Sequence, residues 1–289
     1  MISEMVNNFE NYLYRTIFPV KLPEIIYHYT TQKGILGIIS DRVMWATQVH
    51  FLNDKNEVYL AFKLLDRQLQ KKIDKLQNPA NKNLLRDIRT GLRNVDQWHI
   101  CIASFCEHGD LLSQWRGYGN QGKGYAIGFN LEKLRKIARK QSFILWPCVY
   151  NITLQTELVN YLIESWCENF FDKDVNHEEM VSFVHTSVCQ LAPIIKDDGF
   201  SEEQEWRLVS QVLTNKSPLF AFREGAYSLI PYLNFKIVDE EGKDCIVKTT
   251  VGPSPHMSLA RNSLSAFFSS CKLNSVEIID SKIPFRNWK

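Results

Sequence analysis

Three short stretches of the sequence carry side chains that could do chemistry. The first is Tyr27–Thr31, where His28 stands near the end of an apolar, β-prone run and is followed by threonines. A histidine at the end of a strand can hydrogen-bond a ligand at the edge of a sheet. The competing interpretation is a buried histidine bonded to backbone, and His28 taken alone favours that interpretation.

The second stretch, Ser113–Tyr125, has four glycines among eight of its residues. Glycine lets the backbone approach a ligand closely, and the tryptophan and tyrosines of the stretch offer planar faces. Arg116 and Lys123 could bind phosphate. The spacing matches neither a Walker A loop nor the Rossmann fingerprint. A flexible hairpin would explain the glycines equally well.

The third stretch surrounds Glu205. In a strand, Glu203, Glu205 and Arg207 would share one face. Two carboxylates and a guanidinium are costly to bury unless they are paired or used. Such a cluster suits the stabilisation of a developing cation and the orientation of a nucleophile. The alternative is an exposed edge strand that carries an ordinary Arg–Glu pair.

Other candidates are weaker. Asn53 and Asp54 are expected to cap the next helix. Only proximity in sequence supports a thiol–imidazole pair between Cys106 and His99 or His108. The seven cysteines are odd in number and irregularly spaced, without a CxxC pair, and the seven histidines are scattered. We therefore expect neither a disulfide framework nor a metal site.

Composition limits the partners. The net charge is +2, so no global field draws the protein to nucleic acid or membrane. The basic clusters Lys71–Lys75 and Lys133–Lys136 lie in helical patterns and are expected to be solvated faces. The N-terminus lacks the pattern of a signal peptide, and apolar runs are too short for a membrane span. These features predict a cytoplasmic protein.

Strand patterns recur along the chain with helical patterns between them, which predicts one α+β domain over residues 1–289. Helical insertions are expected at about 57–96 and 131–196. The predicted strands are Glu24–Tyr29, Val43–Ala46, Trp98–Phe105, Gly124–Phe129, Glu205–Val212, Ser228–Phe235, Cys245–Val251 and Val276–Ile279.

Several blocks together resemble the bacterial DUF2971 family, over roughly residues 25–286. The family name itself implies no activity. The blocks are Tyr27–Thr30, Leu52–Asp54 with Glu57, Ala103–Phe105, Gln114–Gly119 with Gly124, Glu203–Arg207, Ile230–Tyr232, Val251–Pro253 and Ser281–Arg286.

A looser resemblance is to the ADP-ribosyltransferase fold, in which a split antiparallel β core carries an H-Y-E triad. It implies that His28 holds a ribose of NAD and that Glu205 stabilises the oxocarbenium ion as nicotinamide leaves. Glu203, two positions earlier, is similar to the first residue of an E-x-E pair. The aromatic that stacks on nicotinamide is left open among Trp115, Tyr118 and Tyr125.

The same resemblance implies further NAD contacts from Tyr29, Thr30 and Ser104, with Arg116 or Arg207 at the pyrophosphate. The implied function is transfer of ADP-ribose from NAD to a macromolecular acceptor, protein or nucleic acid, by a toxin or phage-defence effector. NAD hydrolysis, or binding without catalysis, would use the same site. The acceptor and the oligomeric state stay open.

Overall fold

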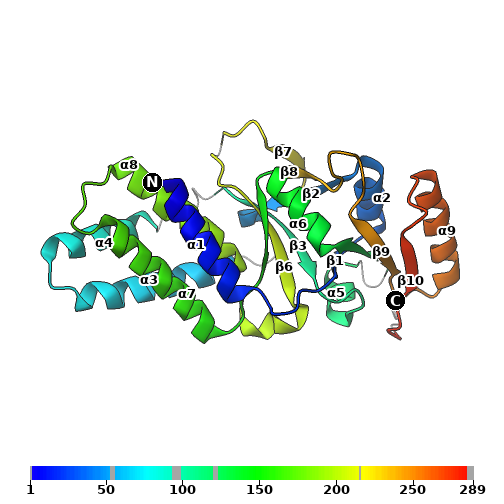
Figure 1. Cartoon of the computed structure of the whole chain (residues 1–289). Coiled ribbons are helices and arrows are strands. Elements are labelled where there is room, and N and C mark those ends of the chain that lie inside the picture. The colour runs from blue at the N-terminus through cyan, green and yellow to red at the C-terminus, as the bar shows by residue number, and fades with distance from the viewer. Residues whose placement is uncertain (1, 53–55, 93–98, 120–122, 215, 285–289) are drawn as a thin grey trace.

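Strands from the whole length of the chain meet in one mixed sheet, which the computed structural model shows beside a group of helices (Figure 1). The structure describes residues 2–52, 56–92, 99–119, 123–214 and 216–284. The pairings between named strands are antiparallel except for β9 with β10. The strands are β1 Ile25–Thr30, β2 Val43–Gln48, β3 Cys101–Cys106, β4 Tyr125–Asn130, β5 Phe143–Pro147, β6 Glu205–Ser210, β7 Ala221–Glu224, β8 Leu229–Lys236, β9 Ile246–Val251 and β10 Glu277–Asp280.

The sheet divides at β3. One edge of β3 pairs along its length with β6, which in turn pairs with β5. The other edge is shared, because β2 pairs with its beginning at Cys101 and Ile102 while β1 pairs with its end at Cys106. Between these two pairings, β1 and β2 diverge from β3. We call this divergence the split; it confirms the predicted α+β fold with a split, mostly antiparallel core.

The helices form two groups, each with its own apolar core. In Figure 1, one group extends from one end of the sheet, whereas the other lies against the strands. The first group is α1 Ile2–Ile17, α3 Asn56–Lys75, α4 Pro79–Gly91, α7 Ile152–Phe170 and α8 His177–Leu191. The second is α2 Gln32–Asp41, α6 Leu131–Lys140 and α9 Met257–Ser270. Strand residues such as Val209 pack into the first core, and their neighbours such as Leu208 pack into the second, so β6 joins the two by the period-two alternation of its side chains.

Capping residues fix where the site elements begin. Thr31 Oγ1 accepts the backbone N–H of Gly34 at 3.1 Å, so α2 starts directly after β1 as its sequence predicts. A Cβ at Gly34 would meet Thr30 Oγ1 at 1.9 Å, so a larger residue at this position would displace the Thr30 side chain. The end of β1 and the first turn of α2 are therefore held together.

The structure departs from one expectation about the middle of the chain and from one alternative interpretation. The segment 131–196 is not a purely helical insertion, because β5 lies within it and pairs with β6 along five positions. Ser113–Tyr125 is not a hairpin, because it contains the helix α5 Leu112–Gly117 before β4. The apolar run of β5 is too short to be separated from helix by periodicity alone.

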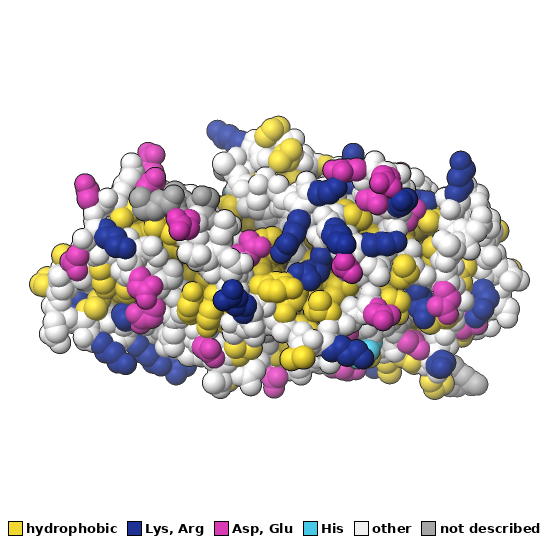
Figure 2. Space-filling model, viewed as in Figure 1, with side chains coloured by type: hydrophobic (Ala, Val, Ile, Leu, Met, Phe, Trp, Pro, Cys, Tyr) yellow, Lys and Arg dark blue, Asp and Glu magenta, His cyan; other side chains and the backbone are white. Residues whose placement is uncertain are grey.

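The basic clusters are solvated helix faces, as expected. Lys133 and Lys136 are exposed on α6, and Figure 2 shows Lys and Arg side chains gathered over this helix. Lys136 forms an ion pair with Glu132 at 2.7 Å. The exposed pairs of α6 contribute little to stability.

The described residues test only some of the remaining predictions. Asn53 and Asp54 lie outside the described residues. Within the described ranges, no helix has the length and apolarity that crossing a membrane requires. The same ranges contain no cluster of three or more His, Cys, Asp or Glu arranged for a metal ion. That residues 1–289 form a single domain stays a prediction.

Candidate active site

His28 lies on β1 at the split, and the split explains its hydrogen bond. Its Nδ1 lies 2.9 Å from the backbone oxygen of Ser104, in the part of β3 that β1 leaves after Tyr27. The His28 side chain thus donates a hydrogen bond to a carbonyl at the open edge of β3, which β1 does not pair there. Since a carbonyl only accepts, Nδ1 carries the proton and Nε2 is the ring atom that can meet a ligand.

Two features of this region suit a binding site. His28 is half-buried, and burial lowers its pKa although the Ser104 carbonyl raises it. Its imidazole is therefore favoured in the neutral form. Ser104 is exposed although it lies in the middle of β3, where it pairs with Arg207 on one edge and borders the split on the other. The sheet is open to solvent above Ser104.

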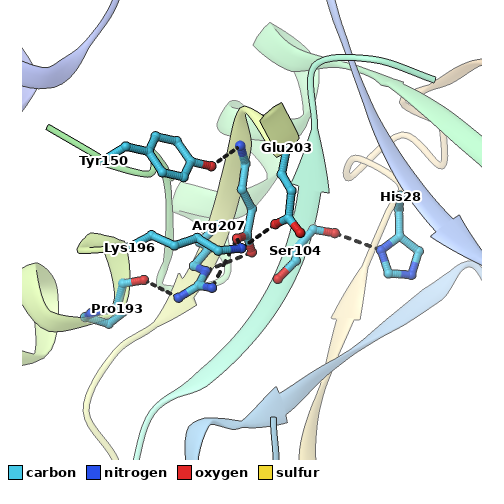
Figure 3. A network of polar contacts seen from close by, with 8 residues as sticks. His28, Ser104, Tyr150, Pro193, Lys196, Glu203 and Arg207 are labelled. Carbon is cyan, nitrogen blue, oxygen red and sulfur yellow. Dashed lines mark hydrogen bonds and ion pairs between the residues drawn. The ribbon is translucent and has the colours of Figure 1, made fainter. Parts of the chain in front are cut away.

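A buried ionic cluster lies on the other side of Ser104 from His28 (Figure 3). Arg207 donates to both carboxylate oxygens of Glu205, at 2.8 and 3.1 Å, and to the carbonyl of Pro193 at 2.6 Å. Lys196 contacts the carboxylates of both Glu203 and Glu205. We call Lys196, Glu203, Glu205 and Arg207 the ionic cluster.

Register places the ionic cluster beside β1. Tyr27 pairs with Cys106, and Cys106 pairs with Glu205, so one row of the sheet runs from β1 to the first residue of β6. Arg207 pairs with Ser104 in the same ladder. The strand positions that carry the predicted His and Glu are therefore neighbours around β3, although nearly 180 residues of sequence separate them. Tyr27, not His28, is in register with Glu205, so the His28 side chain leaves the opposite face of the sheet, where its ring lies near Phe105.

The cations of the cluster keep Glu205 ionised. Burial would raise the pKa of this carboxyl, but Arg207 and Lys196 lower it to about 2. Burial raises the pKa of the Cys106 thiol, and the nearby carboxylates of Glu205 and Glu203 raise it further. Glu205 is thus an anion at neutral pH, and Cys106 is a protonated thiol without nucleophilic character.

Glu203 reaches the cluster by a different route from the one expected. The strand begins at Glu205, not at Glu203, and the short helix η4 Asp198–Glu203 ends before it. Gln204 between them has a left-handed backbone with φ of 40°. This reversal turns both carboxylates toward Lys196. The side chain of Glu203 keeps 16% of its surface exposed against 6% for Glu205.

The sequence did not single out Lys196 or Tyr150. Lys196 is 3% exposed at the end of the apolar run 191–195. A lysine directly after such a run is the available signal, because it must pair when it is buried. The Tyr150 hydroxyl accepts the backbone N–H of Glu205 at 2.8 Å, which fixes where β6 begins.

Tyr29 and Trp115 form part of a small core instead of a ligand surface. The Tyr29 hydroxyl donates to the carbonyl of His108 and accepts the N–H of Leu111, so it fastens the segment before α5. Trp115 is fully buried against Tyr29 and donates to Asp110 at 2.8 Å. Burial removes Trp115 from the aromatics that a ligand can reach here.

The remaining predicted contacts are scattered around this core. Tyr118 is 46% exposed after α5, and Arg116 is exposed on that helix. Tyr125 is 9% exposed on β4, where it pairs with Thr30, which is also buried. Of the three candidate aromatics, Tyr118 is the one that presents a large surface to solvent.

The family comparison matches part of the chain. Residues 114–208 match the family described as "Protein of unknown function (DUF2971)". This confirms the predicted resemblance over the segment from α5 to β6, which includes Glu203, Glu205 and Arg207. No curated protein matches the chain.

Among solved structures, the chain is similar to "Thermus sp. 2.9 DarT in complex with ADP-ribosylated ssDNA". The two share 10% sequence identity, with 93% of this chain and 99% of that chain covered and a TM-score of 0.35.

Proposed function

We propose that the protein is an NAD-dependent ADP-ribosyltransferase whose site lies at the split. The observation that carries the proposal is the arrangement in Figure 3, where His28 lies on one side of the exposed Ser104 and the carboxylates of the ionic cluster lie on the other. A neutral imidazole with Nε2 available can hydrogen-bond a ribose hydroxyl. A fixed carboxylate has the correct sign to stabilise an oxocarbenium ion as nicotinamide leaves.

Exposure divides the roles of the two carboxylates. Glu205 is held by both Arg207 and Lys196, so we assign it to positioning the cluster. Glu203 contacts Lys196 and keeps more exposed surface, so we assign it the contact with the ligand. Tyr118 is the proposed aromatic for nicotinamide, and Arg116 in the last turn of α5 is the proposed pyrophosphate contact. We further propose that ADP-ribose passes to a macromolecule, the chemistry of a toxin or phage-defence effector.

The experiment is incubation of the purified protein with NAD, with and without cell lysate, followed by measurement of free nicotinamide and of adenine label on macromolecules. We expect nicotinamide release together with labelled macromolecule. His28→Ala should reduce release, and His256→Ala is the matched control because His256 is exposed at the start of α9, outside the proposed site. Release without label would identify an NAD glycohydrolase that uses the same site.

A second candidate is a nucleotide-binding module without catalysis. The observation that favours it is that two cations already neutralise Glu205 in the interior. Saturable NAD binding without any nicotinamide release, with or without lysate, would replace the transferase by this binding module. The absence of both binding and release would reject both candidates.

A further inference from the structure

Trp45 presents an exposed indole from the middle of a paired strand. It is 50% exposed on β2, whose edge pairs with β8 from Val43 to Thr47. Its ring lies against that of Tyr232, with centroids 4.7 Å apart and planes 33° apart. The Trp45 ring is packed on one side by Tyr232 and is open to solvent on the other, so its free face can stack on a planar ligand.

Polar groups surround this indole. The Arg223 guanidinium lies 6.0 Å from the centre of the Trp45 ring, and its Nη2 donates to Thr47 Oγ1 at 3.4 Å. Arg223 Nε is buried and has no hydrogen-bond partner in the described part of the chain. Asn234, the ladder partner of Trp45, is exposed. A cation, an amide and a hydroxyl thus border one aromatic platform.

The platform borders the split on the side opposite His28. Thr47 pairs with Ile102, and Trp45 lies two residues earlier on β2 with its side chain on the same face. Ser104 lies two residues after Ile102 on β3, so its exposed side chain belongs to that face as well. The aromatic platform is therefore adjacent to the proposed active site.

We propose that Trp45, Tyr232, Arg223, Thr47 and Asn234 form a stacking site for a base of single-stranded nucleic acid, which would serve as the acceptor. This inference rests on the proposed function in one respect: the bound strand is an acceptor only if the protein is an ADP-ribosyltransferase. The binding itself is independent of NAD. An indole stacks on any base, an amide can pair with a base edge, and a guanidinium can meet the adjoining phosphate.

Chemistry favours a single strand over a protein partner. The core of a protein interface is apolar around its aromatic anchors, whereas hydrogen-bonding side chains adjoin Trp45. A duplex keeps its base faces stacked inside and cannot cover the indole. With a net charge of only +2, binding should depend on stacking more than on a basic surface.

The test measures how fluorescent oligonucleotides, each made of one type of base, bind to the full chain without NAD. Each oligonucleotide is tested as a single strand and as a duplex with its complement. We expect single strands to bind and duplexes to bind more weakly. Trp45→Ala should weaken single-strand binding about tenfold, whereas Trp45→Phe should retain most of it. Arg223→Gln should reduce the salt slope by about 0.7, the value of one phosphate contact. Phe222→Ala is the matched control, because Phe222 is 59% exposed and alternates with Arg223 onto the other face of β7.

The outcomes separate the possibilities. Equal competition by a free mononucleotide, equal binding of duplex, or unchanged affinity in a folded Trp45→Ala protein would overturn the proposal. So would capture of a protein from lysate through Trp45 when no oligonucleotide binds. Nicotinamide release in a protein that binds no oligonucleotide would overturn this inference while leaving the transferase proposal standing. Oligonucleotide binding in a protein that releases no nicotinamide would overturn the transferase proposal and leave the stacking site standing.

Discussion

Replacing Glu205 by Gln is expected to lower the free energy of unfolding by about 3 to 5 kcal/mol, the usual cost of removing one partner from a buried ion pair. The substitution keeps the shape of the side chain but removes the charge that balances Arg207 and Lys196, which are each 3% exposed. Urea unfolding of the wild-type and variant proteins measures the difference.

Two controls separate this charge effect from a general effect of substitution. Glu202→Gln should change stability by less than about 0.5 kcal/mol, because Glu202 is exposed. Lys196 still contacts Glu203 in the single variant, so the cation that loses its carboxylate is Arg207. In the double variant Arg207→Met with Glu205→Gln this cation is absent, so part of the loss should return. A Glu205→Gln protein as stable as the wild type would show that the ionic cluster does not hold this part of the fold together.

The pKa of Glu205 gives the same claim a pH dependence. Its folded value of about 2 lies below the ordinary value of 4.5. The unfolded chain therefore binds the proton first, and the contribution is complete above pH 4.5 and is lost as the pH falls toward 2. Between pH 4.5 and pH 2, the free energy of unfolding of the wild type should fall by about 3 kcal/mol more than that of Glu205→Gln.

Glu203→Gln is expected to reduce nicotinamide release from NAD about 100- to 1000-fold, the usual cost of removing one group that stabilises a charged transition state. The fold should survive, because Glu205 still pairs with Lys196 and Glu203 is partly exposed. The measurement is the initial rate of nicotinamide release at saturating NAD, with the unfolding midpoint recorded for each protein. Glu202→Gln again serves as the matched control.

An unchanged rate in a folded Glu203→Gln protein would remove Glu203 from the reaction. If Glu205→Gln instead lost release while remaining folded under the assay conditions, Glu205 would be the residue that contacts the ligand. The division of roles by exposure would then be wrong, whereas the location of the site would stand.

Local pattern predicted much of the fold around the site. The strands that carry His28 and Glu205 follow from apolar, β-prone runs, and Thr31 as the cap of α2 follows from its position before a helical pattern. The pairing of Arg207 with Glu205 follows from strand alternation once burial is assumed, since a buried carboxylate needs a partner.

What could not be predicted depends on contacts between distant segments. The split arises because β1 and β2 share one edge of β3, and no local pattern encodes this register. Lys196 joins the ionic cluster because the chain between β5 and β6 returns to the sheet, where Val149 bridges Ile195. The same reason applies to Trp115, which the segment after β3 places in a core with Tyr29. Sequence could mark such residues as capable of chemistry but could not say which are buried.

The most direct test of the account is the side-chain nitrogen NMR of His28 during titration with NAD, with His256 as the internal reference. The account predicts that Nε2 of His28 shifts on saturation while Nδ1, held by the Ser104 carbonyl, changes little. His256 should not respond. A His28 ring whose nitrogen signals are unchanged when NAD is bound would place the NAD site elsewhere and contradict the account.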